Sequence, residues 1–287
     1  MRRILLALAA LAAFTLPAIA APETLTVKAG KTERDLILYT PADTSGPVPL
    51  VMVFHGGGGG ADWMANKSRE LTRTLTGGGY AVAYMNGSSR RDSEKLRTWN
   101  AVWCCAYAQR KKIDDAAYAD AAVEAIDTRI GIDRTRIFLM GHSNGAMLSY
   151  RLAGAMKVAP RAIAPVSGAI FADQPDVPDR TSIFMYHAVD DDVLSYAGNP
   201  YDKAERWRTA PHLAFTGAEA KLAELKSCGP ASASPAPAGL ATTARTCPGG
   251  SVILATSADT GSHDWPARPQ ADYSIEAELL AFFNSQR

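Results

Sequence analysis

The most constraining feature of the sequence is a serine between glycines, GHSNG at positions 141–145, placed where a strand is expected to meet a helix. Residues 136–140 form an apolar run typical of a buried strand, and the residues after the motif carry leucines four positions apart, as in a helix beginning near Asn144. A serine on such a tight turn has a strained backbone and projects its hydroxyl above the sheet edge. Ser143 is therefore a candidate nucleophile, and a helix N-cap serine is the alternative interpretation.

Apolar runs alternate with helical patterns along the rest of the chain, which favours a largely parallel sheet covered by helices. With 47% apolar and 21% charged residues, the chain can bury a large core and is not a disordered or coiled-coil sequence. The segment 229–246, rich in alanine, serine and proline, is predicted to be a surface loop. We expect one α/β domain over 21–287, with an opening hairpin at 24–27 and 35–39, strands at 50–54, 80–85, 136–140, 163–166, 183–186 and 252–255, and helices at 114–130 and near the C-terminus.

The first twenty residues have the pattern of a secretory signal peptide. Arg2 and Arg3 precede an uncharged apolar stretch, and Ala18-Ile19-Ala20 is the small-x-small pattern of a cleavage site. The apolar run is short and broken at Pro17, whereas about 20 apolar residues are needed to span a bilayer. We therefore expect residues 1–20 to be removed and the protein to be secreted or periplasmic, without a membrane anchor.

The charge balance gives little guidance to binding partners. The formal net charge of +1 provides no electrostatic reason to expect nucleic acid or an anionic membrane. No feature indicates an obligate protein partner. The expected ligand is a small or oligomeric molecule that need not be charged.

A serine hydroxyl becomes a good nucleophile only when a base takes its proton, and a carboxylate usually orients that base. In strand–serine–helix proteins of this kind the order along the chain is serine, acid, histidine. Of the five histidines, His263 fits best, because it follows the final predicted strand and precedes the last helix. The acid should follow strand 183–186, where Asp190, Asp191 and Asp192 are adjacent and the pattern alone does not choose among them.

The glycine run after strand 50–54 is placed where a backbone N–H could stabilise a negatively charged oxygen. Gly57 is the first candidate for this oxyanion hole and Gly58 the second, with the backbone amide of Asn144 as the other donor. The run lacks the Lys-Ser/Thr of a phosphate-binding P-loop, and the histidines lack the HExxH spacing of a zinc site. We expect no cofactor and no metal.

The four cysteines divide into two pairs. Cys228 and Cys247 flank the predicted loop, and a bridge between them would restrain it. Cys104 and Cys105 are adjacent, so they form either two thiols or a vicinal disulfide.

Several ordered blocks together resemble the secreted α/β-hydrolase esterases grouped as polyhydroxybutyrate depolymerase-like and feruloyl esterase-like proteins, including the LpqC-type members. The blocks span roughly 48–285 and comprise FHGGGGG at 54–60, WNAVWCCAYA at 99–108, the stretch around GHSNG, HAVDDDVLSY at 187–196 and SHDWP at 262–266. The resemblance implies an α/β-hydrolase fold and a serine esterase with a Ser-His-Asp triad. Its expected substrates are short polyhydroxyalkanoate oligomers or related hydroxyacyl esters. Alternatives are feruloyl or acetyl esters of plant polysaccharides, or a noncatalytic binding protein on the same scaffold.

The same resemblance assigns further residues. The family pattern places its aspartate four residues after a histidine, which counts from His187 to Asp191, although Ala188 and Ser195 depart from that pattern. It also supports a Cys228–Cys247 disulfide. Finally, it implies that Trp99, Trp103 and Trp265 line the acyl or aryl pocket, with core packing as the alternative for Trp99.

Overall fold

A ten-stranded sheet runs through the protein, in the strand order β1-β2-β4-β3-β5-β6-β7-β10-β9-β8. The computed structural model describes residues 21–30, 32–91, 93, 95–171, 173, 177–199, 211–266 and 273–286, so the expected signal peptide lies outside the described residues. The six central strands are parallel, and antiparallel strands extend the sheet on both sides. The strands are β1 (Glu23–Ala29), β2 (Thr32–Tyr39), β3 (Val48–Phe54), β4 (Ala81–Met85), β5 (Ile132–His142), β6 (Ala162–Val166), β7 (Ser182–Ala188), β8 (Ser232–Ser234), β9 (Leu240–Thr246) and β10 (Val252–Ala258).

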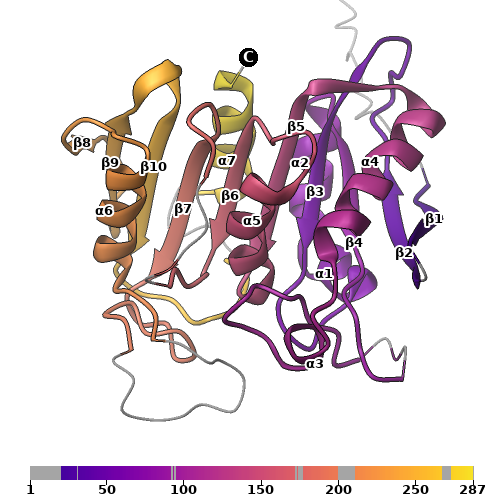
Figure 1. Ribbon diagram of the computed structural model, residues 1–287. Helices are drawn as coiled ribbons and strands as arrows, with labels where there is room; N and C mark the ends of the chain where they lie inside the picture. The colour runs from indigo at the N-terminus through magenta and orange to yellow at the C-terminus, as the bar shows by residue number, and fades with distance from the viewer. Residues whose placement is uncertain are drawn as a thin grey trace, which may run out of the picture.

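Helices cover both faces of this sheet. In Figure 1, α4, α5 and α6 lie in front of the strands, and α1, α2 and α7 lie behind them. The described helices are α1 (Ala61–Lys67), α2 (Arg69–Gly77), α3 (Ala106–Arg110), α4 (Asp115–Ile130), α5 (Asn144–Ala155), α6 (Phe215–Leu225), the short 3-10 turn η1 (Pro248–Gly250) and α7 (Ile275–Ser285). This three-layer arrangement is the predicted α/β architecture.

The two layers of core explain the continuous apolar runs in the sequence. Along β3, Leu50, Met52 and Phe54 belong to the cluster under α4 to α6, whereas Val51 and Val53 belong to the cluster under α1, α2 and α7. Alternate residues of a strand point to opposite faces, so a strand buried on both sides needs apolar residues throughout. The predicted strands and the predicted helix 114–130 are all found.

The segment 229–246 was expected to be a loop, and this prediction is wrong. It contains β8 and β9, and β9 pairs antiparallel along the whole of β10. The strand is polar because it lies near the sheet edge, where most of its side chains are only half-buried, so no apolar period reveals it. Helix α6, with Phe215 and Leu222 buried against the sheet, was also not predicted.

Both cysteine pairs are disulfides. Cys228 follows α6 and is joined to Cys247, which precedes η1 and β10. This is the predicted bridge. Cys104 and Cys105 are joined as neighbours, which decides between the two alternatives left open by the sequence.

Parallel strands place their carboxyl ends at one edge of the sheet. The chain leaves β3 towards α1 on one face and leaves the neighbouring β5 towards α5 on the other. Crevices form where successive connections diverge in this way, and ligands bind there in open α/β sheets. The loops after β3, β5, β7 and β10 meet at this edge, which is the lower one in Figure 1.

Candidate active site

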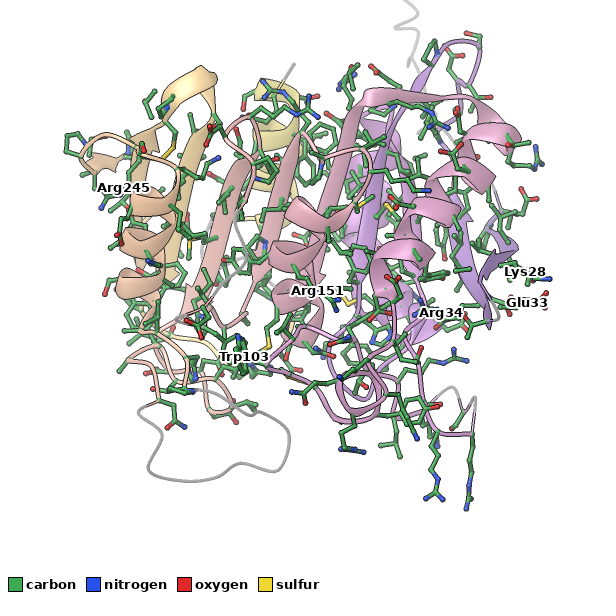
Figure 2. The ribbon with its side chains drawn as sticks, viewed as in Figure 1. Lys28, Glu33, Arg34, Trp103, Arg151 and Arg245 are labelled. Atoms are coloured by element: carbon green, nitrogen blue, oxygen red, sulfur yellow. A yellow bond between two sulfur atoms is a disulfide. The ribbon has the colours of Figure 1, made fainter. Side chains whose placement is uncertain are left out.

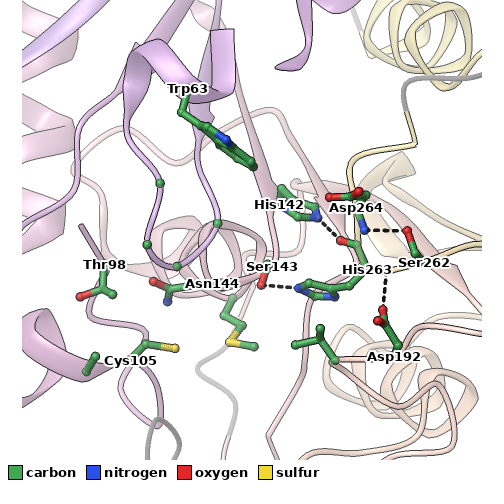
Figure 3. A pocket seen from close by; sticks show the side chains of 17 residues that line it. Trp63, Thr98, Cys105, His142, Ser143, Asn144, Asp192, Ser262, His263 and Asp264 are labelled. Atoms are coloured by element: carbon green, nitrogen blue, oxygen red, sulfur yellow. Dashed lines mark hydrogen bonds between the residues drawn. The ribbon is translucent and has the colours of Figure 1, made fainter. Parts of the chain in front are cut away.

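A cavity of about 710 Å³ opens at the carboxyl ends of the central strands. Its walls come from segments far apart in the sequence, among them the glycine run, the serine turn and the loop after β10 (Figure 3). The lining residues are Gly56, Gly57, Gly58, Gly59, Trp63, Thr98, Cys105, Ala106, His142, Ser143, Asn144, Met147, Asp192, Val193, Ser262, His263 and Asp264.

The turn at Ser143 has the geometry predicted from GHSNG. Ser143 has a φ of 55°, which is unfavourable for a residue with a Cβ atom. A Cβ on Gly145 would lie 2.1 Å from the carbonyl oxygen of Phe54, and one on Gly141 would lie 2.2 Å from Gly145. The flanking glycines are therefore required by the close approach of α5 to β3 and to its own preceding strand.

Three predicted residues lie in series at the base of the cavity. Ser143 Oγ lies 2.8 Å from Nε2 of His263, and Nδ1 of His263 lies 2.8 Å from one carboxylate oxygen of Asp191 and 3.0 Å from the other. A proton on Nδ1 is shared with the carboxylate, which leaves the Nε2 lone pair for the serine hydroxyl. This arrangement can take a proton from Ser143 and return it to another atom at the same place.

Asp191 is held as an anion. Burial alone would raise its pKa, but hydrogen bonds from His187, from His263 and from the backbone amide of Leu194 outweigh burial and hold the pKa well below its usual range. Asp191 is buried, whereas Asp190 and Asp192 are exposed. The geometry therefore distinguishes Asp191 from the other two acids, which the sequence pattern alone left open.

In the glycine run at 56–60, hydrogen bonds with other described residues hold every glycine except Gly57. The Gly58 amide donates to the Arg97 carbonyl (2.8 Å). This amide, the second candidate for the oxyanion hole, is therefore already engaged in a hydrogen bond. Nε2 of buried His55 accepts from the Gly87 amide at 3.0 Å, so its Nδ1 carries the proton donated to the Gly56 carbonyl at 2.7 Å. Burial lowers the pKa of His55 to about 4, which keeps this neutral tautomer. Among the described residues, no hydrogen bond uses the Gly57 amide, which lies at the cavity wall.

Asn144 is the first residue of α5, where backbone N–H groups have no partner within the helix. Like Gly57, Asn144 lines the cavity, so its amide is available as a second candidate donor there. The side chain has a different role, because Asn144 Oδ1 accepts from the Trp99 amide at 2.8 Å and Nδ2 donates to the Trp99 carbonyl at 3.2 Å. This clamp between α5 and the loop at 96–105 was not predicted.

The three tryptophans expected to line the pocket do not line this cavity. Trp99 is fully buried against Phe54, and its Nε1 donates to the His55 carbonyl at 2.8 Å. Trp265 is 3% exposed, and its Nε1 donates to Glu276. Trp103 is partly buried against a small apolar cluster, two members of which, Cys105 and Met147, line the cavity. In this structure the three residues pack behind or beside the cavity, as the alternative for Trp99 allowed, and the aromatic residue in the cavity wall is Trp63 of α1, which is 46% exposed.

The loop at 96–105 is anchored by charged groups, among them Arg34 and Arg151, which are labelled in Figure 2. Arg34 pairs with buried Asp115 at 2.7 Å, and the other Asp115 oxygen accepts from the Asn100 amide at 2.8 Å. Arg151 of α5 donates to the Asn100 carbonyl. These contacts join β2, α4 and α5 to the loop that the Asn144 side chain holds.

The part of the chain that the structure describes holds no cluster of three side chains suited to a metal ion. Within the same described ranges, every helix is too short or too polar to cross a membrane.

Comparison with known proteins places this geometry in context. No family model matches the chain. It is 25% identical over 166 residues to the bifunctional acetylxylan esterase/xylanase XynS20E of Neocallimastix patriciarum, a match covering 57% of this chain and only 22% of that protein. It is also 25% identical over 259 residues to the putative esterase NocK of Nocardia uniformis subsp. tsuyamanensis, covering 84% of this chain and 72% of that one.

Solved structures agree on the fold. The acetyl xylan esterase from Aspergillus awamori superposes with a TM-score of 0.64 at 13% identity, covering 92% of this chain and all of that one. A carboxylesterase from Bacillus cereus gives a TM-score of 0.57 at 12% identity, covering 88% and 94% of the two chains. The chain therefore has the α/β-hydrolase fold, as predicted.

Proposed function

We propose that this protein is an exported serine esterase that hydrolyses carboxylic esters through an acyl-enzyme. The observation that carries the proposal is the chain of contacts from Ser143 through His263 to Asp191 at the floor of the cavity. The esterase relatives support a carboxylic ester hydrolase. The disulfide between Cys228 and Cys247 supports an oxidising compartment, in agreement with the expected signal peptide.

In the proposed mechanism, Ser143 Oγ attacks the ester carbonyl carbon while His263 Nε2 takes the hydroxyl proton. The carbonyl oxygen becomes an oxyanion that the Gly57 and Asn144 amides stabilise, each donor contributing about 3 kcal/mol in related chemistry. The tetrahedral intermediate collapses, and the proton passes from His263 to the leaving alcohol. Water then loses a proton to His263 and attacks the acyl carbon. The bond from that carbon to Ser143 Oγ breaks, His263 returns the proton to Oγ, and the acid is released. Asp191 holds the imidazole and stabilises its protonated form throughout.

The decisive experiment is labelling with a fluorophosphonate, which reacts with an activated serine. We expect the wild-type protein to be labelled and Ser143→Ala not to be labelled. A folded wild type that is neither labelled nor hydrolytic would support the alternative of a noncatalytic binding protein on this scaffold.

We propose short hydroxyalkanoate oligomers or related hydroxyacyl esters as substrates. A second candidate is acetyl or feruloyl esters of plant polysaccharides. It is favoured by the half-exposed Trp63, which lines the cavity together with polar Ser262 and Asp264, because an indole suits a sugar ring. The names of the acetylxylan esterases among the similar proteins point the same way. Rates on hydroxybutyrate oligomers, acetylated xylan and methyl ferulate would distinguish these substrates.

A further inference from the structure

The loop that carries His263 has little backbone support of its own. It runs from the end of β10 at Ala258 to Trp265, and residues 259–262 and 264 are exposed. Loops with few buried contacts are mobile, and a catalytic group displaced by about 1 Å can lose about 100-fold in rate. Asp191 holds the imidazole, and contacts from other segments to the His263 backbone would fix its position relative to Ser143 further.

Two side chains, one at the end of β5 and one in the loop after β7, bind the backbone of His263. His142 Nε2 lies 2.7 Å from the His263 carbonyl oxygen, and Asp192 Oδ1 lies 3.2 Å from the His263 amide (Figure 3). A carbonyl oxygen only accepts, so His142 must carry its proton on Nε2 and donate it. Asp192 accepts from the amide. Both backbone polar groups of the proposed base are thus held.

His142 is well placed for this task. It is 4% exposed, and its ring lies 5.2 Å from the ring of His263 and 6.4 Å from that of Trp265, which belongs to the same loop. Its other nitrogen faces Gly56, where an added Cβ would lie 3.0 Å away. Burial is the main reason that the pKa of His142 falls to about 4, so the ring remains a neutral single donor at pH 7.

His142 is also the residue next to Ser143. The covalent link from Ser143 to His142, the bond from His142 to the His263 backbone and the bond from His263 Nε2 to Ser143 Oγ form a closed ring. A displacement of the His263 loop that opened the Ser143 contact would also break the His142 bond. The ring therefore couples the position of the base to that of the nucleophile.

We propose that His142 and Asp192 are positioning residues, which hold the backbone of His263 so that its imidazole meets Ser143. They contact no reacting atom in this role. The inference rests on the proposed function, because it assigns them to the same hydrolytic site.

The test uses paired variants at each position. His142→Phe keeps a ring but loses the donor, whereas His142→Gln places an amide N–H near the position of Nε2. We expect kcat on p-nitrophenyl acetate to fall about 10- to 100-fold in His142→Phe with KM within about threefold, and the fluorophosphonate labelling rate to fall by the same factor. His142→Gln should recover most of both rates.

Asp192 allows a second test. Its side chain is exposed, so a substitution there does not disturb the packing of the core. Asp192→Ala should lower kcat several-fold at unchanged KM, whereas Asp192→Asn, which keeps an accepting oxygen, should be close to wild type. Thr181→Val is the matched control. It also removes a buried side-chain donor to a backbone carbonyl, that of Pro160 (2.7 Å), but at the amino end of β7, opposite the edge that carries the cavity. Its kcat should be unchanged.

Undiminished kcat in a folded His142→Phe, equal losses in His142→Phe and His142→Gln, or undiminished kcat in Asp192→Ala would each overturn the inference. Failure of the proposed function has a different signature, because the wild type itself would then neither hydrolyse esters nor be labelled.

Discussion

At the scale of single residues, Asp191 shows how environment separates chemically identical neighbours. Its Oδ1 accepts from the Val193 and Leu194 amides at 2.9 and 2.7 Å, and both carboxylate oxygens contact Nδ1 of His263. We expect Asp191→Asn to lower kcat by about four orders of magnitude, because an amide favours the wrong imidazole tautomer. Steady-state kinetics on a p-nitrophenyl ester measures the loss.

The control for this prediction is Asp190→Asn. Asp190 is an exposed neighbour, and its carboxylate forms no hydrogen bond or ion pair with the described residues. Its kcat should stay within about twofold of wild type. A comparable loss in both variants would contradict the assignment of Asp191.

The sequence predicted Ser143 and His263 because each follows a strand in a recognisable order. It could not predict the roles of His142 or the Asn144 side chain, since these depend on contacts with residues 121 and 45 positions away in the sequence. The packing contacts of Trp99 and Trp265 are of the same long-range kind, to Phe54 and to Glu276. An aromatic residue near a catalytic motif can lie in the cavity wall or behind it, and which of the two it does depends on how the segments pack together.

At the scale of elements, the serine turn depends on the contact between α5 and β3. We expect Gly145→Ala to lower the free energy of unfolding by about 3 kcal/mol or more and to abolish labelling of Ser143, because its Cβ would overlap the Phe54 carbonyl. Chemical denaturation and fluorophosphonate labelling measure the two effects.

Gly217→Ala in α6 provides the comparison, because a Cβ there meets only the Leu213 side chain at 4.0 Å. Helix propensity should make this variant about 0.5 to 1 kcal/mol more stable. Equal effects at both glycines would show that steric overlap at the turn is not the cause.

A second prediction at this scale concerns the disulfide that ties α6 to the start of β10. Cys228→Ser/Cys247→Ser opens a bridge with a sequence separation of 19 and should lower the free energy of unfolding by about 3 kcal/mol. Because Cys247 precedes the amino end of β10, away from the cavity, kcat should be unchanged. A loss of kcat in the folded variant would contradict this separation of stability from activity.

At the scale of the whole molecule, two buried neutral histidines link stability to pH. The pKa values of His55 and His142 are lowered to about 4, mainly by burial, whereas an unfolded chain has a histidine pKa of about 6.5. Between these values the unfolded state binds more protons, so the stability present above pH 6.5 is lost as the pH falls towards 4.

We expect the preferential protonation of each histidine in the unfolded state to lower the free energy of unfolding by about 2 to 3 kcal/mol as the pH falls from 7 to 4.5. Denaturant titrations at the two pH values measure the fall, and His142→Gln should show a smaller one. An identical fall in the variant and the wild type would exclude His142 as a source.

The indole of Trp99 joins two parts of the site that would otherwise be independent. Its Nε1 holds the His55 carbonyl, two residues before Gly57, and its own backbone is held by Asn144. Because the indole is fully buried, a change that displaces it would shift the Gly57 and Asn144 backbones together. The spacing of the two proposed oxyanion donors is consequently set by a residue that no substrate touches, so their alignment does not depend on which ester occupies the cleft.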